Sequence, residues 1–181
     1  MATETKLRQL ADKGCPVYYF YSSERYLVRQ AVAAITRILT ADSDEDATVL
    51  DGAAPEIEQL IMAAGTISFF GTRRVVVLPE IDPAAYSDKD LEELNSTLSS
   101  LENAVVVLGS VFELERSKLK TGKRAQKLIA QCKALGCTEE LAKPKPFELK
   151  MMMIDRAKEQ GTNLPDGAAA ALLERCGEDP F

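Results

Sequence analysis

Short, continuous apolar runs, separated by segments long enough for a helix, are the strongest constraint on how this chain folds. The runs are PVYYFY (16–21), RVVVLPE (74–80) and NAVVVLG (103–109). They are rich in β-branched and aromatic residues and lack the alternation of a strand with one wet face, so each predicts a strand buried on both faces. Strands of this kind, joined by helices, form a parallel sheet that is covered on both sides.

Weaker signals complete the alternation. The segments TVLDG (48–52) and CTEE (137–140) predict two further strands. Apolar residues at helical spacing predict helices between the strands, and these residues are Leu7, Leu10, Ala11, Leu27, Ala31, Ile35, Ile38, Ile57, Leu60, Ile61, Leu91, Leu94 and Leu98. Ser22 or Ser23, Pro55 and Ser87 mark helix starts, and a last helix is predicted over 117–135. Residues 1 to about 140 therefore predict an open α/β sandwich of the P-loop ATPase type.

The segment KPKPF (143–147) marks a change in composition. Two prolines separated by a lysine predict a stiff connector. Two helices are expected after it, at about 147–160 and 166–176, joined by GTNLP. We therefore expect two domains, 1–142 and 143–181. Because two short helices bury little surface, we expect the natural protein to continue beyond residue 181.

Charge and composition exclude several classes of function. The formal net charge is −6 and there is no histidine, so no global attraction to nucleic acid is expected and histidine-based catalysis is excluded. No C-x-x-C pair occurs among the cysteines at 15, 132, 137 and 176, so we expect reduced thiols, no zinc site and no cofactor. The longest apolar runs are too short to span a bilayer and no signal peptide is visible, so the expected location is the cytoplasm, with no membrane partner.

A working phosphate loop is missing from the predicted sheet. Such a loop needs glycines, a lysine and a Ser/Thr, whereas the first strand is followed by YSSERYLV. The Gly122-Lys123 pair falls inside the last predicted helix, and Glu80 is interpreted as an ordinary carboxylate at a strand end. We therefore predict that the chain is not an enzyme on its own. The alternative is an ATPase with an unorthodox nucleotide site.

Five basic residues gather near the start of the last predicted helix. They are Lys118, Lys120, Lys123, Arg124 and Lys127. A cluster of this kind binds phosphates, so a DNA-binding module is a second alternative. A solubilising exterior is the competing interpretation, because charge runs on helices usually face solvent.

The stretch TISFFGTRR (66–74) places large apolar side chains between a predicted helix and a predicted strand. These side chains are Ile67, Phe69 and Phe70, and Gly65 before them fits the end of a helix. Two interpretations are open. The side chains fold under and fill the core, or they form an apolar finger that a partner covers.

The order of these motifs resembles the delta subunit family of bacterial DNA polymerase III, over nearly the whole chain. The family pattern G-x-E-x-x-L is matched by Ser22-Ser23-Glu24 with Leu27, where serine replaces glycine. Further matches are Phe70-Gly71 through Arg74-Val75-Val76, Ala157 to Gly161, Ala168 to Leu172, and Cys176-Gly177. Ile67 and Phe69 differ in type from the usual family residues but remain large and apolar.

The resemblance implies a fold and a role. The fold would be an AAA+-like domain without a functional phosphate loop, followed by the start of a helical lid domain, with the family's collar domain absent. The role would be a non-catalytic arm of the clamp loader that binds the sliding clamp (the beta subunit) through Ile67, Phe69 and Phe70 and helps to open it. Arg73 and Arg74 would contact acidic clamp residues or would only flank the strand. Other clamp-loader subunits, and primed DNA through the assembled complex, are the further partners implied.

Overall fold

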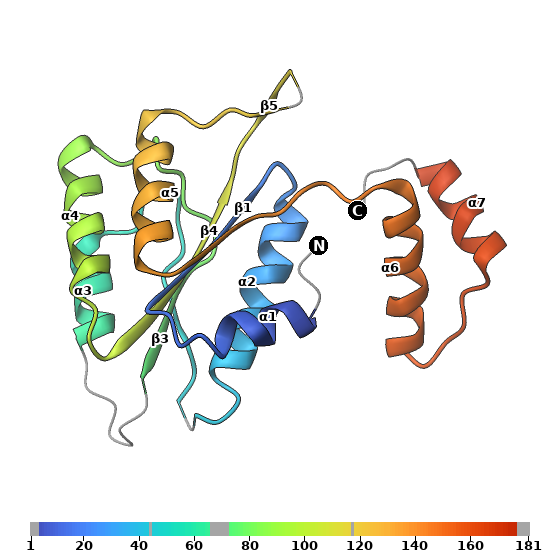
Figure 1. Cartoon of the computed structure of the whole chain (residues 1–181), viewed down its shortest axis with the longest axis horizontal. Helices are drawn as coiled ribbons and strands as arrows, with labels where there is room; N and C mark the ends of the chain where they lie inside the picture. The colour runs from blue at the N-terminus through green and yellow to red at the C-terminus, as the bar shows by residue number, and fades with distance from the viewer. Residues whose placement is uncertain (1–3, 44, 66–72, 117, 177–181) are drawn as a thin grey trace. The chain divides into compact units, whose positions relative to one another are not determined.

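The chain folds into two compact units, which are described separately. A computed structural model describes residues 4–43, 45–65, 73–116 and 118–176. The larger unit is Ala2–Leu141 and the smaller is Ala142–Phe181. Within the described residues of the larger unit, five parallel strands form one sheet in the order β2-β3-β4-β1-β7. This is the predicted α/β architecture with a parallel sheet (Figure 1).

The three central strands come from the apolar runs that predicted them. The strands of the sheet are β1 (Val17–Ser22), β2 (Thr48–Val49), β3 (Arg74–Leu78), β4 (Ala104–Val111) and β7 (Cys137–Glu140). In the register, Val17 lies beside Val106, and Val76 lies between Thr48 and Val106. The strands begin at one edge of the sheet, the amino edge, and finish at the opposite one, the carboxyl edge. β2 is shorter than the predicted 48–52, although the Leu50 amide still donates to the carbonyl of Val77 in β3 at 2.9 Å, and the next helix is α3 (Ile57–Gly65).

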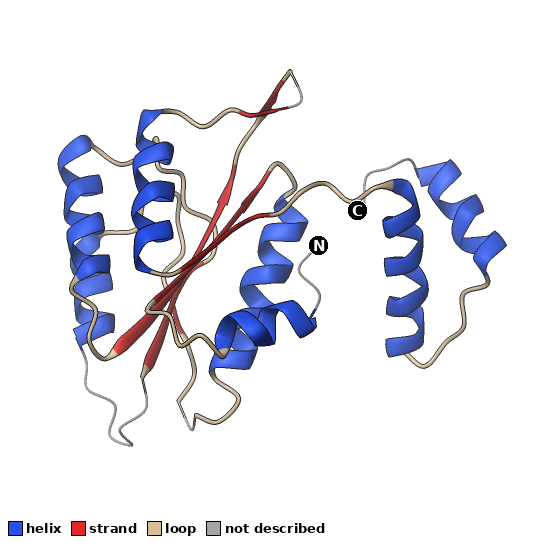
Figure 2. Ribbon diagram, in the orientation of Figure 1, coloured by secondary structure: helices blue, strands red, loops and turns tan. Residues whose placement is uncertain are grey.

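Helices cover both faces of the sheet, as Figures 1 and 2 show. One face carries α1 (Glu4–Ala11) and α2 (Arg25–Leu39), and the other carries α3, α4 (Asp88–Ser99) and α5 (Lys123–Leu135). Successive residues of β1 alternate between the two cores: Tyr19 packs with α3, α4 and α5, and Phe20 packs with α1 and α2. Both are fully buried, which explains why the sequence shows no apolar–polar alternation. Each buried side chain of this size contributes roughly 1.5–3 kcal/mol.

Helix starts agree with the sequence at α4 and differ at α2. The Ser87 hydroxyl accepts a hydrogen bond from the Asp90 amide at 3.1 Å and caps α4 as predicted. The predicted caps of α2, Ser22 and Ser23, are wrong, because Glu24 occupies the N-cap position without a side-chain bond to the helix. Ser22 is the last residue of β1 and its hydroxyl is used elsewhere.

The predicted inward position of Ile61 is also wrong. Ile57 and Leu60 are buried, whereas Ile61 is 46% exposed. Ile61 lies on the side of α3 that lines a groove toward the end of the helix. Its neighbour Met62 is 67% exposed.

The prediction of one helix over 117–135 is wrong in its first part. A two-stranded antiparallel hairpin, β5 (Leu114–Glu115) and β6 (Lys118–Leu119), precedes α5. α5 begins at Lys123 with Gly122 as its N-cap, so Gly122-Lys123 lies at a helix start and not inside a helix. The hairpin pairs Leu114 with Leu119 and Glu115 with Lys118.

The smaller unit contains two helices close to the predicted ranges. They are α6 (Pro146–Glu159) and α7 (Asp166–Cys176). Lys150 Nζ lies 2.7 Å from Asp166 Oδ1 and links the two helices. Phe147 is 67% exposed, with the Lys150 ammonium 5.6 Å from its ring centroid. Among the described residues of the chain, no helix combines the length and the apolar character needed to cross a bilayer.

Candidate functional site

The predicted clamp-binding residues Ile67, Phe69 and Phe70 lie outside the described residues. The structure does describe the chain on either side of them. α3 ends at Gly65, and β3 begins at Arg74. The surface between these two ends is therefore the part of the candidate site whose geometry can be given.

A groove adjoins the end of α3. It has a volume of about 470 Å³ and lies between α3, the end of α4 and the segment that leads into β4. Its lining includes Ile61, Ala64 and Gly65 from α3 and Asn103 just before β4. The end of α3 thus lies at the amino edge of the sheet. Ile61 is exposed and gives this groove an apolar border.

Arg73 and Arg74 both contact groups of their own domain. An Arg73 Nη1–H donates to the carbonyl of Gly14 at 3.1 Å, and Arg74 Nε lies 3.4 Å from Glu45 Oε2. These contacts tie the start of β3 to the loop after α1 and to the segment before β2. They support the interpretation that the two arginines anchor the strand, and contact with a clamp stays a prediction.

The carboxyl edge, where P-loop proteins bind phosphate, is closed by the chain's own hydrogen bonds. The buried Ser22 hydroxyl donates to the carbonyl of Leu141 at 2.6 Å and accepts from the Glu24 amide at 3.1 Å. Glu24 then places a carboxylate at the N-terminus of α2. A phosphate at this helix end would need free amides and would meet a negative charge.

Glu80, at the carboxyl edge beyond β3, is neutralised by two arginines of α2. Its Oε1 lies 2.7 Å from Arg25 Nε, and its Oε2 lies 3.1 Å from Arg29 Nη2. The carboxylate is therefore engaged in ion pairs and is not presented as a metal ligand. Within the described ranges, no group of three or more His, Cys, Asp or Glu side chains could hold a metal ion.

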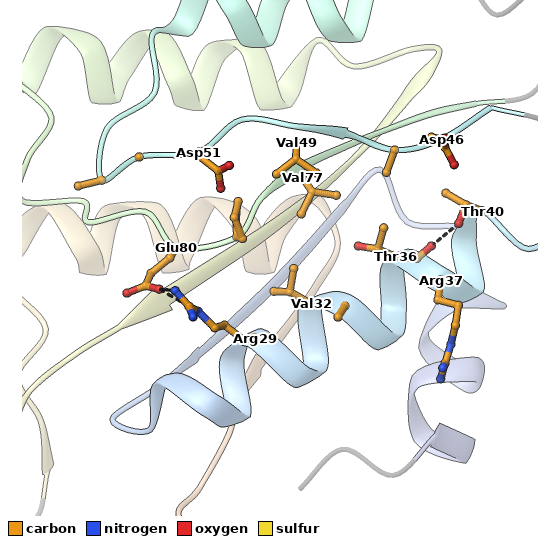
Figure 3. Close-up of a pocket in the computed structure, with 15 residues that line it drawn as sticks. Arg29, Val32, Thr36, Arg37, Thr40, Asp46, Val49, Asp51, Val77 and Glu80 are labelled. Atoms are coloured by element: carbon orange, nitrogen blue, oxygen red, sulfur yellow. Dashed lines mark hydrogen bonds and ion pairs between the residues drawn. The ribbon is translucent and has the colours of Figure 1, made fainter. Parts of the chain in front are cut away.

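A broad groove of about 920 Å³ runs beside this ion pair, between α2 and strands β2 and β3 (Figure 3). Val32, Val49 and Val77 give it apolar walls. Its charged groups are of both signs, with Arg29 and Glu80 paired and Asp51 nearby. This mixture offers no net attraction for a polyphosphate.

The basic cluster is divided between two elements. Lys118 belongs to β6, Lys120 follows it, and Lys123, Arg124 and Lys127 lie on α5. The Arg124 guanidinium donates to Asp88 Oδ1 at 2.7 Å and to the carbonyl of Ala84 at 3.1 Å. This hydrogen bond and the charge of Arg124 lower the pKa of Asp88. Lys120 Nζ lies 3.8 Å from Glu113, so part of the cluster's charge is offset within the domain.

Lys118, Lys123 and Lys127 are exposed. Lys123 and Lys127 are four residues apart on α5 and therefore lie on one side of the helix. They are the members of the cluster best placed to meet a phosphate backbone.

Sequence reasoning missed the Glu80–Arg25–Arg29 cluster and the role of Ser22. A signal for the first was present, since Arg25 and Arg29 are four residues apart and therefore lie on one side of the helix. The strand order was needed to name the partner. The Ser22–Leu141 contact joins residues 119 positions apart, and no local pattern indicates it.

Comparison with known proteins agrees with this architecture. The family described as "DNA polymerase III, delta subunit" matches residues 18–137, more than half of the chain. The DNA polymerase III subunit delta of Bacillus subtilis is 28% identical over 137 residues, which cover 68% of this chain and 39% of that protein.

Solved structures share the fold at low identity. A Bacillus subtilis DNA clamp loader delta protein matches with a TM-score of 0.58 and 24% identity, over 94% of this chain and 52% of that one. Domain III of the Thermotoga maritima replication initiation protein DnaA matches with a TM-score of 0.59 and 13% identity, over 94% and 74%. Thermotoga maritima RuvB matches with a TM-score of 0.58 and 16% identity, over 98% and 56%. The chain thus spans about half or less of the two delta proteins that it matches.

Proposed function

The chain belongs to the DNA polymerase III delta subunit family, and we propose from this that it binds the sliding clamp and helps to open it when the clamp is loaded onto DNA. Ile67, Phe69 and Phe70 would form the wedge that enters a pocket on the clamp. The observation that carries the proposal is their place in the matched region, directly between α3 and β3. The other clamp-loader subunits are proposed as partners, and the cytoplasm as the location.

The described flanks of this segment support a rigid attachment. Ile57 and Leu60 hold α3 in the core, and Arg73 and Arg74 hold the start of β3. A wedge fixed at both ends loses less freedom on binding than a free loop would. Exposed Ile61 and Met62 provide neighbouring apolar surface on the same helix end.

The free energy expected from burying the wedge is adequate for a specific contact. Burying three large apolar side chains contributes roughly 1.5–3 kcal/mol each, against an association cost of several kcal/mol. The wedge would thus supply much of a modest affinity. To favour an open ring, it must contact the open form better than the closed one.

A non-catalytic role fits the carboxyl edge. The turn after β1 has neither glycine nor lysine, Ser22 closes it, and Glu80 is paired with Arg25 and Arg29. We propose that residues 1–142 form the clamp-binding AAA+-like domain without nucleotide hydrolysis. Residues 143–181 would begin the helical lid domain.

Titration of purified sliding clamp against the chain and its Phe69→Ala/Phe70→Ala variant tests the proposal. We expect the variant to bind at least about 100-fold more weakly, since two buried phenylalanines contribute roughly 3 kcal/mol or more together. Phe147→Ala is the matched control, because this phenylalanine is equally large and 67% exposed but lies on α6. Equal affinity of wild type and the double variant would reject the assignment.

DNA contact through the basic cluster is a second candidate, favoured by the exposure of Lys118, Lys123 and Lys127. We expect binding to primed duplex to weaken with salt and to be lost when these three lysines are replaced by glutamate. The Arg124→Gln variant is the control, because Arg124 already pairs with Asp88. Unchanged binding in the triple variant would remove the lysines from any DNA interface.

A further inference from the structure

Two thiols lie in contact at the amino edge of the sheet. Cys15 Sγ and Cys137 Sγ are 3.1 Å apart, although 122 positions separate them in the sequence. Cys15 belongs to the loop between α1 and β1, and Cys137 is the first residue of β7, opposite Tyr18 of β1 in the register. A disulfide has an S–S distance of about 2.05 Å, so roughly 1 Å of movement would bring the sulfurs to bonding distance.

Neighbouring groups contact the backbone of Cys15 and the thiol of Cys137. The Cys15 amide donates to the Tyr18 hydroxyl at 3.2 Å, and that hydroxyl donates to the carbonyl of Leu10 at 3.2 Å. The same carbonyl lies 4.0 Å from Cys137 Sγ. The phenol thus fixes the backbone of Cys15, and the Leu10 carbonyl lies against the Cys137 thiol.

Access to the pair is unequal. Cys15 is half-buried and lines a pocket of about 220 Å³, together with Gly14, Tyr18 and Arg73. Cys137 is only 6% exposed, and burial, followed by the neighbouring Cys15, raises its pKa to about 12. A small oxidant entering the pocket therefore meets Cys15 first.

We propose that Cys15 and Cys137 form a reversible oxidation site, in which a hydroperoxide converts the two thiols into one disulfide. In the first step Cys15 sulfur attacks the peroxide, the O–O bond breaks, and a sulfenic acid and one molecule of water (or alcohol) form. In the second step Cys137 sulfur displaces the hydroxyl group of the sulfenic acid, which leaves as water with the Cys137 proton. The two thiols together lose two electrons, which reduce one peroxide. A thiol reductant reverses the change.

The disulfide would fasten the edge strand β7 to the loop in front of β1. Without it, β7 is held by four residues of ladder with β1 and by the contacts of Cys137 and Leu141 in the core. A link between positions 15 and 137 encloses most of the larger unit, so it restricts the unfolded chain strongly. Oxidation is thus expected to stabilise this unit.

Peptide mapping of the oxidised chain tests the pairing directly. Trypsin places the four cysteines on separate peptides, 14–25, 128–133, 134–150 and 176–181. After treatment with stoichiometric hydrogen peroxide and alkylation, we expect peptides 14–25 and 134–150 to be linked, two hydrogen atoms lighter than their sum. Dithiothreitol should release both. Cys15 found as a sulfinic acid, or linked to another cysteine, with Cys137 still alkylated, would overturn the proposal.

Thermal unfolding provides a second readout on wild-type protein. We expect the oxidised chain to melt about 10 °C higher than the reduced chain, as a long closed loop predicts. Cys15→Ser should abolish the shift, whereas Cys132→Ala should keep it, because Cys132 is buried on α5 without a thiol partner among the described cysteines. The same gain in Cys15→Ser, or none in linked wild type, would contradict the proposed link.

Discussion

The two edges of the sheet differ in what they leave open to solvent. At the carboxyl edge, Ser22 and Glu80 are satisfied inside the domain, by Leu141 and by two arginines of α2. At the amino edge, Ile61 borders an open groove and Cys15 lines a pocket. At the carboxyl edge the polar groups therefore hold the domain together. The proposed partner contact, in contrast, follows α3, whose end lies at the amino edge.

The difference between the two edges predicts that variants at the carboxyl edge change the stability of the domain and not its affinity for the clamp. The largest such effect is expected for Gly109→Ala. A Cβ at this position would lie 2.2 Å from the carbonyl oxygen of Pro79 and 2.8 Å from Val28 Cγ1, and a backbone carbonyl cannot move aside. We expect a loss of about 3 kcal/mol in urea unfolding, at the upper end of overpacking costs. Gly122→Ala, with no atom within 4 Å of its added carbon, should lose well under half of that.

Ser22→Ala should have the next largest effect. The hydroxyl is buried and makes two hydrogen bonds, so its removal leaves the Leu141 carbonyl and the Glu24 amide without this partner. A loss of about 2 kcal/mol is expected from thermal or urea unfolding. Ser23→Ala, one residue away and less buried, serves as the control. A weakened clamp interaction in fully folded Ser22→Ala would break the proposed separation of the edges.

Glu80→Gln tests whether the carboxylate is structural. Arg25 and Arg29 are largely exposed, so the ion pairs are screened and we expect a loss of at most about 1 kcal/mol. ATP with magnesium should not shift the melting temperature of either wild type or variant. An ATP-dependent stabilisation that Glu80→Gln removes would instead favour the alternative of an unorthodox nucleotide site.

The smallest effect is expected for the exposed Asp88–Arg124 pair. Arg124 lowers the pKa of Asp88 in the folded state below its ordinary value of 3.8. The pair therefore contributes stability at neutral pH, and this contribution is lost as the pH falls below 3.8 through the lowered value. Asp88→Asn should flatten this part of the stability profile in acid and leave clamp binding unchanged. An identical acid profile for wild type and variant would show that the pair contributes nothing measurable.

Much of the fold was predictable because the decisive signals are local. The runs that became β1, β3 and β4 are buried on both faces and therefore apolar throughout. Ser87 predicted the start of α4 correctly, because an N-cap residue bonds to an amide within the first turn of its helix. The hairpin β5–β6 escaped prediction because its strands have two residues each and its turn contains Arg116 at φ +49° in place of the expected glycine.

The contacts that define the two edges were not predictable in the same way. Glu80 meets Arg29 across 51 positions, and Cys15 meets Cys137 across 122, so both depend on strand order and register. The spacing of the cysteines indicated only free thiols. The wedge residues Ile67, Phe69 and Phe70 stay a prediction from the family pattern.

Hydrogen–deuterium exchange with and without the sliding clamp is the most direct test of the central claim. The account predicts that the clamp slows exchange in peptides that contain residues 66–72 and the end of α3, and leaves residues 22–29 and 78–81 unchanged. Protection at the carboxyl edge with none over 66–72 would contradict it.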